Sequence, residues 1–372
     1  MCRGTDFAGA EGERGAASPS LLTFVIGTGR CGSTMLSRIL HMHPAVLSLS
    51  EFWNMFRDAE GHDVPTHEIS GLEFWQRITA PDTFQDGLEL AGIPYDESPY
   101  PADRGRFDPA TGVPAVSRVL AQLTDDPDGL YDKLASVVPA WPIRSGTAQS
   151  RALFAALAGM LGRAVVVERS GGSGNLMPML RAQLPNARFV FLHRDGPDSA
   201  LSMSRHPAFR RSAMLAVAEA VRDGWSSMPA EMFTEEIREA TQEDFDGLAS
   251  PPFDRERFQA YPLPPALFGG IWSSLTRTGT SEFFQIARDG WTTMRYERIL
   301  ADPRTELSRL ASFIGVAAEP GWLDRATAFV DTGCAGRAAH RLHPGDLPAL
   351  RAACVTGTRA FDLVEAEAGS GL

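Results

Sequence analysis

A glycine-rich turn near the N-terminus has the composition of an anion-binding loop. Residues 27–34 form the octapeptide Gly-Thr-Gly-Arg-Cys-Gly-Ser-Thr, between an apolar run and apolar residues at helical spacing. Successive backbone N–H groups at a helix N-terminus, with the hydroxyls of Ser33 and Thr34, can bind phosphate oxygens. The sequence therefore predicts an anion site at this turn, and a tight turn without any ligand is the alternative.

The same turn lacks one residue that nucleotide hydrolysis needs. Its two outer glycines have the spacing of a Walker A loop, but Ser33 stands where that loop carries lysine. Lys133 is the only lysine of the chain and lies far along the sequence. Glu168, which follows an apolar run, is a weak candidate for a magnesium-binding acid because Arg169 adjoins it.

A second segment, 189–204, combines an arginine and a serine at a fixed spacing. We expect a strand to end at His193 and to place Arg194 at the edge of the sheet where α/β folds bind ligands. Pro197 then begins a helix that carries Ser202. A guanidinium group and a hydroxyl can converge on one anionic group. The alternative is a surface arginine and an unrelated serine.

A carboxylate, Glu51, follows another predicted strand, 45–49. A carboxylate at a sheet edge can accept the proton of an attacking hydroxyl. A helix-capping or ion-pairing role for Glu51 stays open, and His193 is the alternative base.

The pattern around these residues is that of an α/β protein. Strands are predicted at 21–26, 45–49, 164–167, 187–192 and 291–296, with helices at 34–42, 149–161, 176–184, 265–287 and 302–314. This alternation predicts a P-loop-like parallel sheet with helices on both faces. We expect a flexible tail at 1–20, one domain at 21–340 with insertions at about 52–148 and 224–261 that form a cap, and a tail at 341–372 with a short helix at 346–353.

The composition narrows the class of protein. The chain has 372 residues and a formal net charge of -11, which argues against a broad nucleic-acid or anionic-membrane surface. Four scattered cysteines suit a reducing compartment, and no apolar run indicates a signal peptide or a membrane span. We expect a cytoplasmic protein.

The turn and the segment around Arg194 together resemble the two cofactor signatures of the sulfotransferases that use 3′-phosphoadenosine 5′-phosphosulfate (PAPS). The phrases GTGRCGSTML and HRDGPDSALS carry this resemblance, most of all to the tyrosylprotein and bacterial small-molecule subfamily. The resemblance covers roughly residues 21–55 and 150–340 and leaves both insertions unmatched. The residues that it implies for the cofactor are Arg30, Cys31, Gly32, Ser33, Thr34, Arg194, Ser202, Tyr296 and Arg337.

The resemblance also implies a reaction. Glu51 would be the catalytic base, Arg30 would stabilise the leaving phosphate, and Arg169 and Trp53 would contact the acceptor. Phe56, Phe74 and Trp75 would also line the acceptor pocket, unless they form the core of the cap. The expected activity is transfer of a sulfuryl group from PAPS to a hydroxyl of a small-molecule or peptide acceptor, with no metal ion.

Two other functions stay open at this point: a P-loop small-molecule kinase, and a catalytically silent nucleotide-binding protein of the same fold. For partners, we expect a small hydroxylated acceptor, no nucleic acid and no membrane, with a homodimer left open.

Overall fold

The structure is a computed structural model that describes residues 21–56, 65–95, 100–101, 103–224, 226, 228, 232, 246–336 and 338–369. The predicted N-terminal tail, 1–20, lies outside this part of the chain. No helix among the described residues is long and apolar enough to cross a membrane.

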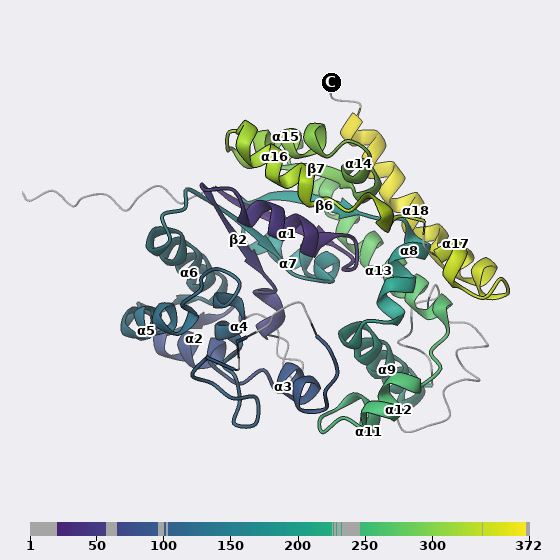
Figure 1. Ribbon diagram of the computed structural model, residues 1–372, viewed down its shortest axis with the longest axis horizontal. Coiled ribbons are helices and arrows are strands. Elements are labelled where there is room, and N and C mark those ends of the chain that lie inside the picture. Colours follow the sequence, from purple (N-terminus) through teal and green to yellow (C-terminus); the bar gives the residue numbers. More distant parts are fainter. Residues whose placement is uncertain are drawn as a thin grey trace, which may run out of the picture.

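Five parallel strands form the centre of the molecule (Figure 1). Their order is β2-β5-β1-β6-β7, with register pairs that include Ser50 with Arg169 and His193 with Arg295. The predicted α/β class with a parallel sheet is confirmed. The strand bounds are Leu22–Gly27 (β1), Val46–Ser50 (β2), Val165–Arg169 (β5), Arg188–His193 (β6) and Trp291–Arg295 (β7).

Both faces of this sheet are covered, which explains why its strands read as nearly continuous apolar runs. Phe24 and Ile26 of β1 face one core, and Val25 between them faces the other. One face packs on α1 (Ser33–His41), α14 (Tyr296–Ala301), α15 (Pro303–Ile314) and α16 (Pro320–Phe329). The other packs on α6 (Gly146–Met160), α7 (Met177–Gln183), α13 (Pro265–Ser281) and α18 (Asp346–Gly369).

The strand order determines where a ligand can bind. β1 lies between β5 and β6, so the chain leaves β1 in one direction and returns on its other side later. In open parallel sheets, ligands bind beyond the carboxyl ends of the strands at such a switch point. Gly27, Ser50, Arg169 and His193 end their strands at this edge.

The first predicted insertion is closed at its base by a short antiparallel ladder of β3 (Glu68–Ile69) with β4 (Arg144–Ser145). Its helices are α2 (Gly71–Ile78), α3 (Thr83–Leu90), α4 (Ala115–Leu120) and α5 (Pro127–Val137). On the opposite side in Figure 1 lie α9 (Pro207–Arg222), α11 (Asp246–Ala249) and α12 (Arg255–Ala260), the last two from the second insertion. α8 (Gly196–Ser204) connects the sheet edge to α9.

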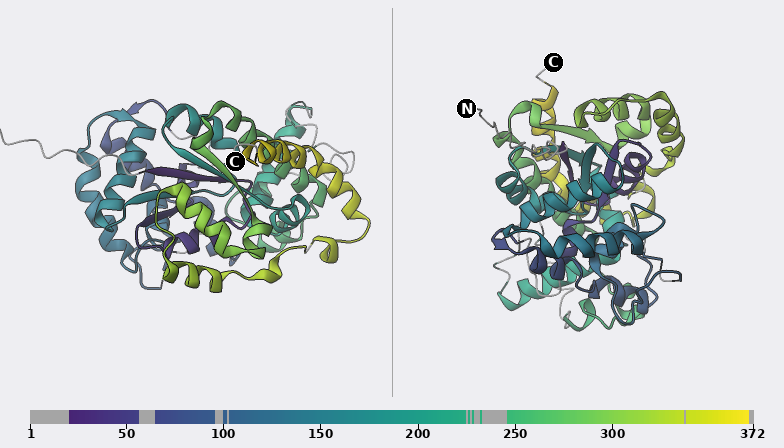
Figure 2. Two further views of the ribbon diagram at one scale, coloured as in Figure 1. Left: turned by 90° about the horizontal axis from the view of Figure 1, so that it is seen from above. Right: turned by 90° about the vertical axis from the view of Figure 1, so that its left-hand side faces the viewer.

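The C-terminal helix corrects the prediction of a tail with a short helix at 346–353. α18 runs from Asp346 to Gly369 and packs along α13 and α8, as its course in the views of Figures 1 and 2 also shows. Small residues allow this close approach: Leu350 and Cys354 lie against Gly269, and Cys354 also lies against Gly196. The segment is therefore part of the core of the domain.

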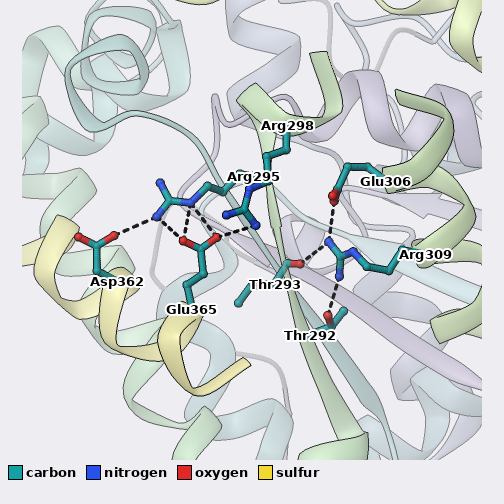
Figure 3. Close-up of polar contacts among 8 residues, drawn as sticks. All are labelled: Thr292, Thr293, Arg295, Arg298, Glu306, Arg309, Asp362 and Glu365. Atoms are coloured by element: carbon teal, nitrogen blue, oxygen red, sulfur yellow. Dashed lines mark hydrogen bonds and ion pairs between the residues drawn. The ribbon is translucent and has the colours of Figure 1, made fainter. Parts of the chain in front are cut away.

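Charged side chains attach the end of α18 to the sheet (Figure 3). Arg295 at the end of β7 donates from Nε to Glu365 at 2.7 Å and from Nη2 to Asp362 at 2.9 Å. Arg298 adds a 3.2 Å ion pair to the same Glu365. In the same view Arg309 donates from Nη2 to the carbonyl of Thr293 at 2.8 Å, so α15 is attached to β7 as well.

Gly357 tests the packing of α18 against α13. A Cβ atom at this position would lie 2.6 Å from Trp272 Cζ3 and 2.8 Å from the Cα of Ser273. We expect Gly357→Ala to lower the free energy of unfolding by about 1–3 kcal/mol through overpacking. This loss outweighs the gain in helix propensity, which is at most about 1 kcal/mol. Urea denaturation monitored by circular dichroism measures the change.

Gly369→Ala is the matched control, because a Cβ there has no neighbour within 4 Å. Its stability should equal or slightly exceed that of the wild type. A Gly357→Ala variant as stable as Gly369→Ala would show that α18 does not pack closely on α13.

Candidate active site

The two sequence motifs meet at the switch point of the sheet. Arg30 in the loop after β1 donates from Nε to Ser202 Oγ of α8 at 3.1 Å. Arg194, which follows β6, donates from Nη1 to the carbonyl oxygen of Arg30 at 3.2 Å. Residues that lie more than 160 positions apart in the sequence therefore share one site.

A hollow of about 240 Å³ opens beside these contacts. Four arginines and one aspartate give it an excess of positive charge, in a chain whose net charge is -11. Its lining residues are Arg30, Arg194, Asp198, Leu201, Ser202, Arg205, His206 and Arg341, and we call it the arginine hollow. Such a hollow can bind a multiply charged anion.

Arg194 is held from several sides. Its guanidinium carbon lies 4.7 Å from the centre of the Tyr296 ring, and its Nη2 lies 3.6 Å from Asp198 Oδ2. Asp198 also accepts hydrogen bonds from the amides of Gly336 at 2.6 Å and Ala338 at 2.7 Å. Gly336 and Ala338 are thus fixed to Asp198. The predicted cofactor residue Arg337 lies outside the described residues.

The loop after β1 presents its backbone rather than its larger side chains. Gly32, with a φ of 88°, is the N-cap of α1 and has no side chain that could cap the first turn of the helix. A Cβ on Gly32 would lie 2.3 Å from the ring of Tyr296, so this close approach requires glycine. The geometry is that of a helix N-terminus available to an anion.

Two predicted cofactor residues, Cys31 and Tyr296, do not line the arginine hollow. The Cys31 side chain is fully buried in the core beneath the loop, and burial raises the pKa of its thiol. Tyr296 is only 5% exposed and lies between Gly32 and the guanidinium group of Arg194. Only the backbone amide of Cys31 can therefore contact a cofactor. The ring of Tyr296 packs against the loop and against Arg194.

Glu51 lines a second cavity of about 250 Å³, which lies next to the arginine hollow because His206 lines both. The sheet edge contributes Glu51, Asn54, Gly171 and Gly172 to its wall. Other lining residues come from α3 and α4 of the first insertion, and from α9 and α13. We call it the Glu51 cavity.

Both oxygens of the Glu51 carboxylate are held. Arg169 Nη1 forms an ion pair with Oε1, while the amide of Gly171 at 2.9 Å and the side-chain amide of Asn54 donate to Oε2. Arg169 in turn donates from Nε to Ser37 Oγ of α1 at 3.1 Å. These contacts fit the ion-pairing role that the sequence left open, and they also orient a carboxylate at the cavity wall. Arg169 itself is only 3% exposed and does not line the Glu51 cavity. It therefore supports Glu51 and is not in the position of the acceptor contact that the resemblance implied.

A second carboxyl group, that of Glu168, is buried near Glu51. Burial raises the pKa of Glu168 to about 8, and the charge of Glu51 acts in the same direction. Ser170 Oγ donates to Glu168 at 2.6 Å and accepts from the amide of Trp53 at 3.0 Å. Glu168 therefore helps to fix the turn that carries Glu51, and it lines neither the Glu51 cavity nor the arginine hollow.

Backbone strain coincides with the two predicted catalytic residues. Among the described residues, Arg30 with a φ of 54° and Glu51 with a φ of 60° are the non-glycine residues in the left-handed region. Such a conformation costs about 1–3 kcal/mol and persists where the surrounding structure enforces it. Strain of this kind concentrates at functional sites.

The predicted acceptor-pocket aromatics Trp53, Phe56, Phe74 and Trp75 do not line the Glu51 cavity. The Trp53 side chain is fully buried and packs on Phe24, Phe56 and Phe154. The prediction that Trp53 contacts the acceptor is therefore wrong, because its indole fills the core between the sheet and α6. Phe56 and Phe74 lie in the same core, and Trp75 packs on Tyr131 at its edge.

His193 is also placed away from the cavity. Its ring is stacked on Phe361 at 3.8 Å and lies edge-on to Trp272. Burial lowers the pKa of His193 to about 3, and the charge of Arg295 acts in the same direction. His193 is a core residue between the sheet and α18 rather than the alternative base.

Several lining residues carried no signal in the sequence. Arg205 and Arg341 add charge to the arginine hollow, and Asn54 holds Glu51. Arg205 directly follows α8, and Arg341 ends α17 (Ala338–Arg341) near the C-terminus. Only the folded chain brings these residues to the site, since no spacing rule connects them to the glycine-rich turn.

No protein-family model and no curated protein matches this chain. Solved structures similar to it include a sulfotransferase domain from the Synechococcus PCC 7002 olefin synthase, at 16% identity and a TM-score of 0.44 over 90% of this chain and 94% of that chain. Another is a sulfotransferase domain from the curacin biosynthetic pathway, at 13% identity and a TM-score of 0.49 over 94% and 98%.

A third is a sulfotransferase from Alicyclobacillus acidocaldarius, at 16% identity and a TM-score of 0.38 over 94% of this chain and 96% of that chain. All three carry the name of the family that the two motifs of this chain resemble. At such identities and TM-scores, the chemistry of this chain has to be argued from its own residues.

The position of His193 predicts a pH dependence of stability. Its pKa is about 3 in the folded chain and about 6.5 in the unfolded chain. Between these values the unfolded state binds a proton that the folded state does not, so stability falls as pH falls from about 6.5 toward 3. We expect His193→Leu to lose less stability than the wild type between pH 7 and pH 5, in urea titrations at each pH. An equal loss in both proteins would contradict the buried, neutral state of His193.

Proposed function

We propose that this chain is a sulfotransferase that uses PAPS as its donor and a hydroxyl group of a small molecule as its acceptor. The observation that carries the proposal is the meeting of Arg30, Arg194 and Ser202 in one hollow beside the cavity of Glu51. A hollow for an anionic donor next to a cavity with a carboxylate is what a group transfer to a hydroxyl requires.

The residues of the arginine hollow fit a nucleotide with phosphates on both the 3′ and the 5′ positions. Arg194 and Ser202 would bind the 3′-phosphate, and Arg205 and Arg341 add charge at the same hollow. Arg30 and the first-turn amides of α1 would bind the 5′-phosphosulfate. The charge of this donor would be balanced by guanidinium and N–H groups, so the proposed reaction needs no metal ion.

PAPS, when bound, supplies a sulfuryl group on a phosphate leaving group. The acceptor hydroxyl oxygen forms the new S–O bond, the bond between sulfur and the phosphate oxygen breaks, and the hydroxyl proton passes to Glu51. Arg169, Asn54 and the Gly171 amide hold the Glu51 carboxylate in one orientation for that transfer. Arg30 would stabilise the charge that develops on the leaving phosphate.

The kinase alternative has little support in this arrangement. A P-loop kinase needs a lysine at the phosphates, and Lys133 lies on α5 and lines neither the arginine hollow nor the Glu51 cavity. A silent nucleotide-binding protein would use the arginine hollow alone. The oriented carboxylate and the strained backbone at Glu51 favour a catalyst over that reading.

One prediction of this proposal concerns the donor site. We expect 3′-phosphoadenosine 5′-phosphate to bind more tightly than 5′-AMP, and Arg194→Ala to weaken its binding at least tenfold. Loss of a charge-assisted hydrogen bond costs about 1.5–3 kcal/mol, which corresponds to that factor. Isothermal titration calorimetry without metal ions measures both affinities.

Arg288→Ala is the matched control, since Arg288 also lies over an aromatic ring, that of Trp291, but lines neither cavity. This variant should bind the nucleotide as the wild type does. Equal affinity of the wild type for the two nucleotides would remove the proposed 3′-phosphate contact.

Another prediction of this proposal separates the rate of sulfate transfer from the affinity for the nucleotide. Glu51→Gln retains the shape of the side chain and removes the base, and general-base catalysis is worth about 10²–10⁴-fold in rate. We expect this variant to transfer sulfate at least a hundredfold more slowly, with unchanged affinity for 3′-phosphoadenosine 5′-phosphate. Mass-detected sulfate transfer across a panel of hydroxylated small molecules provides the rate.

Glu282→Gln serves as the control, because Glu282 is also paired with an arginine, Arg181, outside both cavities. If Glu51→Gln retains full activity, Glu51 is not the base. If it loses nucleotide affinity as well, Glu51 has a structural role only.

A further inference from the structure

The Glu51 cavity has a polar wall that the transfer reaction does not use. It consists of Asp82 and Gln85 at the start of α3, Arg118 of α4 and Arg211 of α9. We call these four residues the α3 wall.

Gln85 presents a buried acceptor at this wall. Its side chain is 7% exposed and lines the cavity, and its Oε1 has no hydrogen-bond partner among the described residues. Buried carbonyl oxygens are nearly always hydrogen-bonded, and an unpaired one costs free energy. A ligand that donates a hydrogen bond from within the cavity would satisfy it.

Asp82 lies beside Gln85 and adds a carboxylate. Its Oδ1 accepts the backbone N–H of Gln85 at 3.0 Å, which caps α3 and orients the carboxyl group. Burial raises the pKa of Asp82, and the charges of Asp86 and Glu89 raise it further, against the effect of Arg118. The charges of Asp86 and Glu89 therefore favour a cationic group over an anionic one beside Asp82.

The two arginines of the α3 wall are already engaged. Arg118 pairs with Asp86 at 2.5 Å and with Glu89 at 2.6 Å. Its buried Nε has no hydrogen-bond partner among the described residues. Arg211 donates to the carbonyl of Ala249 at 2.9 Å and lies 4.8 Å from the centre of the Phe84 ring. Asp86 and Glu89 thus pair with Arg118, and the charge of Asp82 acts on both arginines. The three carboxylates outnumber the two guanidinium groups, so the wall disfavours an anion.

Apart from its polar groups, the cavity is lined largely by rings and aliphatic side chains. These are Met55, Phe84, Tyr95, Phe209, Ile271 and Leu275. A space of about 250 Å³ with such walls fits the body of one small, flat molecule.

From this arrangement we infer that the cavity selects a hydroxylated ring compound that bears a protonated amine at the end remote from the hydroxyl. The ammonium group donates hydrogen bonds to the Asp82 carboxylate and to Gln85 Oε1, while the hydroxyl lies at Glu51. That this ligand is the sulfuryl acceptor rests on the proposed function; that the cavity prefers an amine does not.

Three phenols of similar length test the inference by binding alone. Tyramine carries an amine at the remote end, para-ethylphenol a methyl group, and para-hydroxyphenylpropionate a carboxylate. Calorimetric titration of the full chain, with 3′-phosphoadenosine 5′-phosphate present and absent, should show tyramine binding about tenfold more tightly than para-ethylphenol, and the carboxylate most weakly.

Two variants assign the preference to the α3 wall. Asp82→Asn retains a helix-capping residue but removes the charge, and should reduce the preference for tyramine to less than about threefold. Gln85→Met should weaken tyramine binding and leave para-ethylphenol binding unchanged. Asp126→Asn is the control, since Asp126 caps α5 in the same way on an exposed surface and should alter no affinity.

The outcomes separate the two proposals. Preferential binding of tyramine without any sulfate transfer from PAPS supports the amine site and contradicts the proposed function. Equal binding of the three phenols, tightest binding of the carboxylate, or an unchanged preference in Asp82→Asn overturns the inference, whether or not sulfate is transferred.

Discussion

The contacts of Arg194 are the constraint on which the rest of the site depends. This one guanidinium group lies on the ring of Tyr296, donates to the carbonyl of Arg30 and lies beside Asp198. Through these contacts the end of β6, the loop after β1 and the start of α14 are fixed to one another. A delocalised, planar cation can make stacked and hydrogen-bonded contacts at once, which a lysine ammonium group cannot.

Contacts of two arginines, Arg194 and Arg169, explain how the chain maintains two strained residues. Arg30 is held in the left-handed region by the hydrogen bond that its carbonyl accepts from Arg194. Glu51 is held there by the bond from its amide to the carbonyl of Arg169 at 2.8 Å, and by the ion pair between their side chains. Packing of the sheet on both faces supplies the free energy that offsets this strain. The strained residues therefore direct one side chain toward each of the two adjoining cavities.

The parts of the site that could be predicted from the sequence are those that depend on local geometry. A strand, a glycine turn and a helix in succession predict the loop at 27–34, and the spacing of Arg194 and Ser202 within one strand and helix predicts their shared position. Trp53 shows the limit of this reasoning. Its type and position suggest a ligand contact, but only the packing of α6 on the sheet places its indole in the core.

Long-range packing accounts for the other differences. The sequence predicts only a short helix at 346–353, yet α18 continues past Gly357, where it packs closely on Trp272 of α13, to Gly369. The α3 wall could not be predicted either, because α3, α4 and α9 are brought to one cavity by the fold and share no sequence pattern.

The central claim is that the arginine hollow binds a nucleotide with a 3′-phosphate rather than a nucleoside triphosphate with magnesium. Calorimetry with the wild-type chain tests it most directly, with 3′-phosphoadenosine 5′-phosphate alone in one titration and ATP with magnesium in the other. The account predicts tight, metal-independent binding of the bisphosphate and much weaker binding of ATP. Tighter binding of ATP with magnesium, or no binding of the bisphosphate, would contradict it.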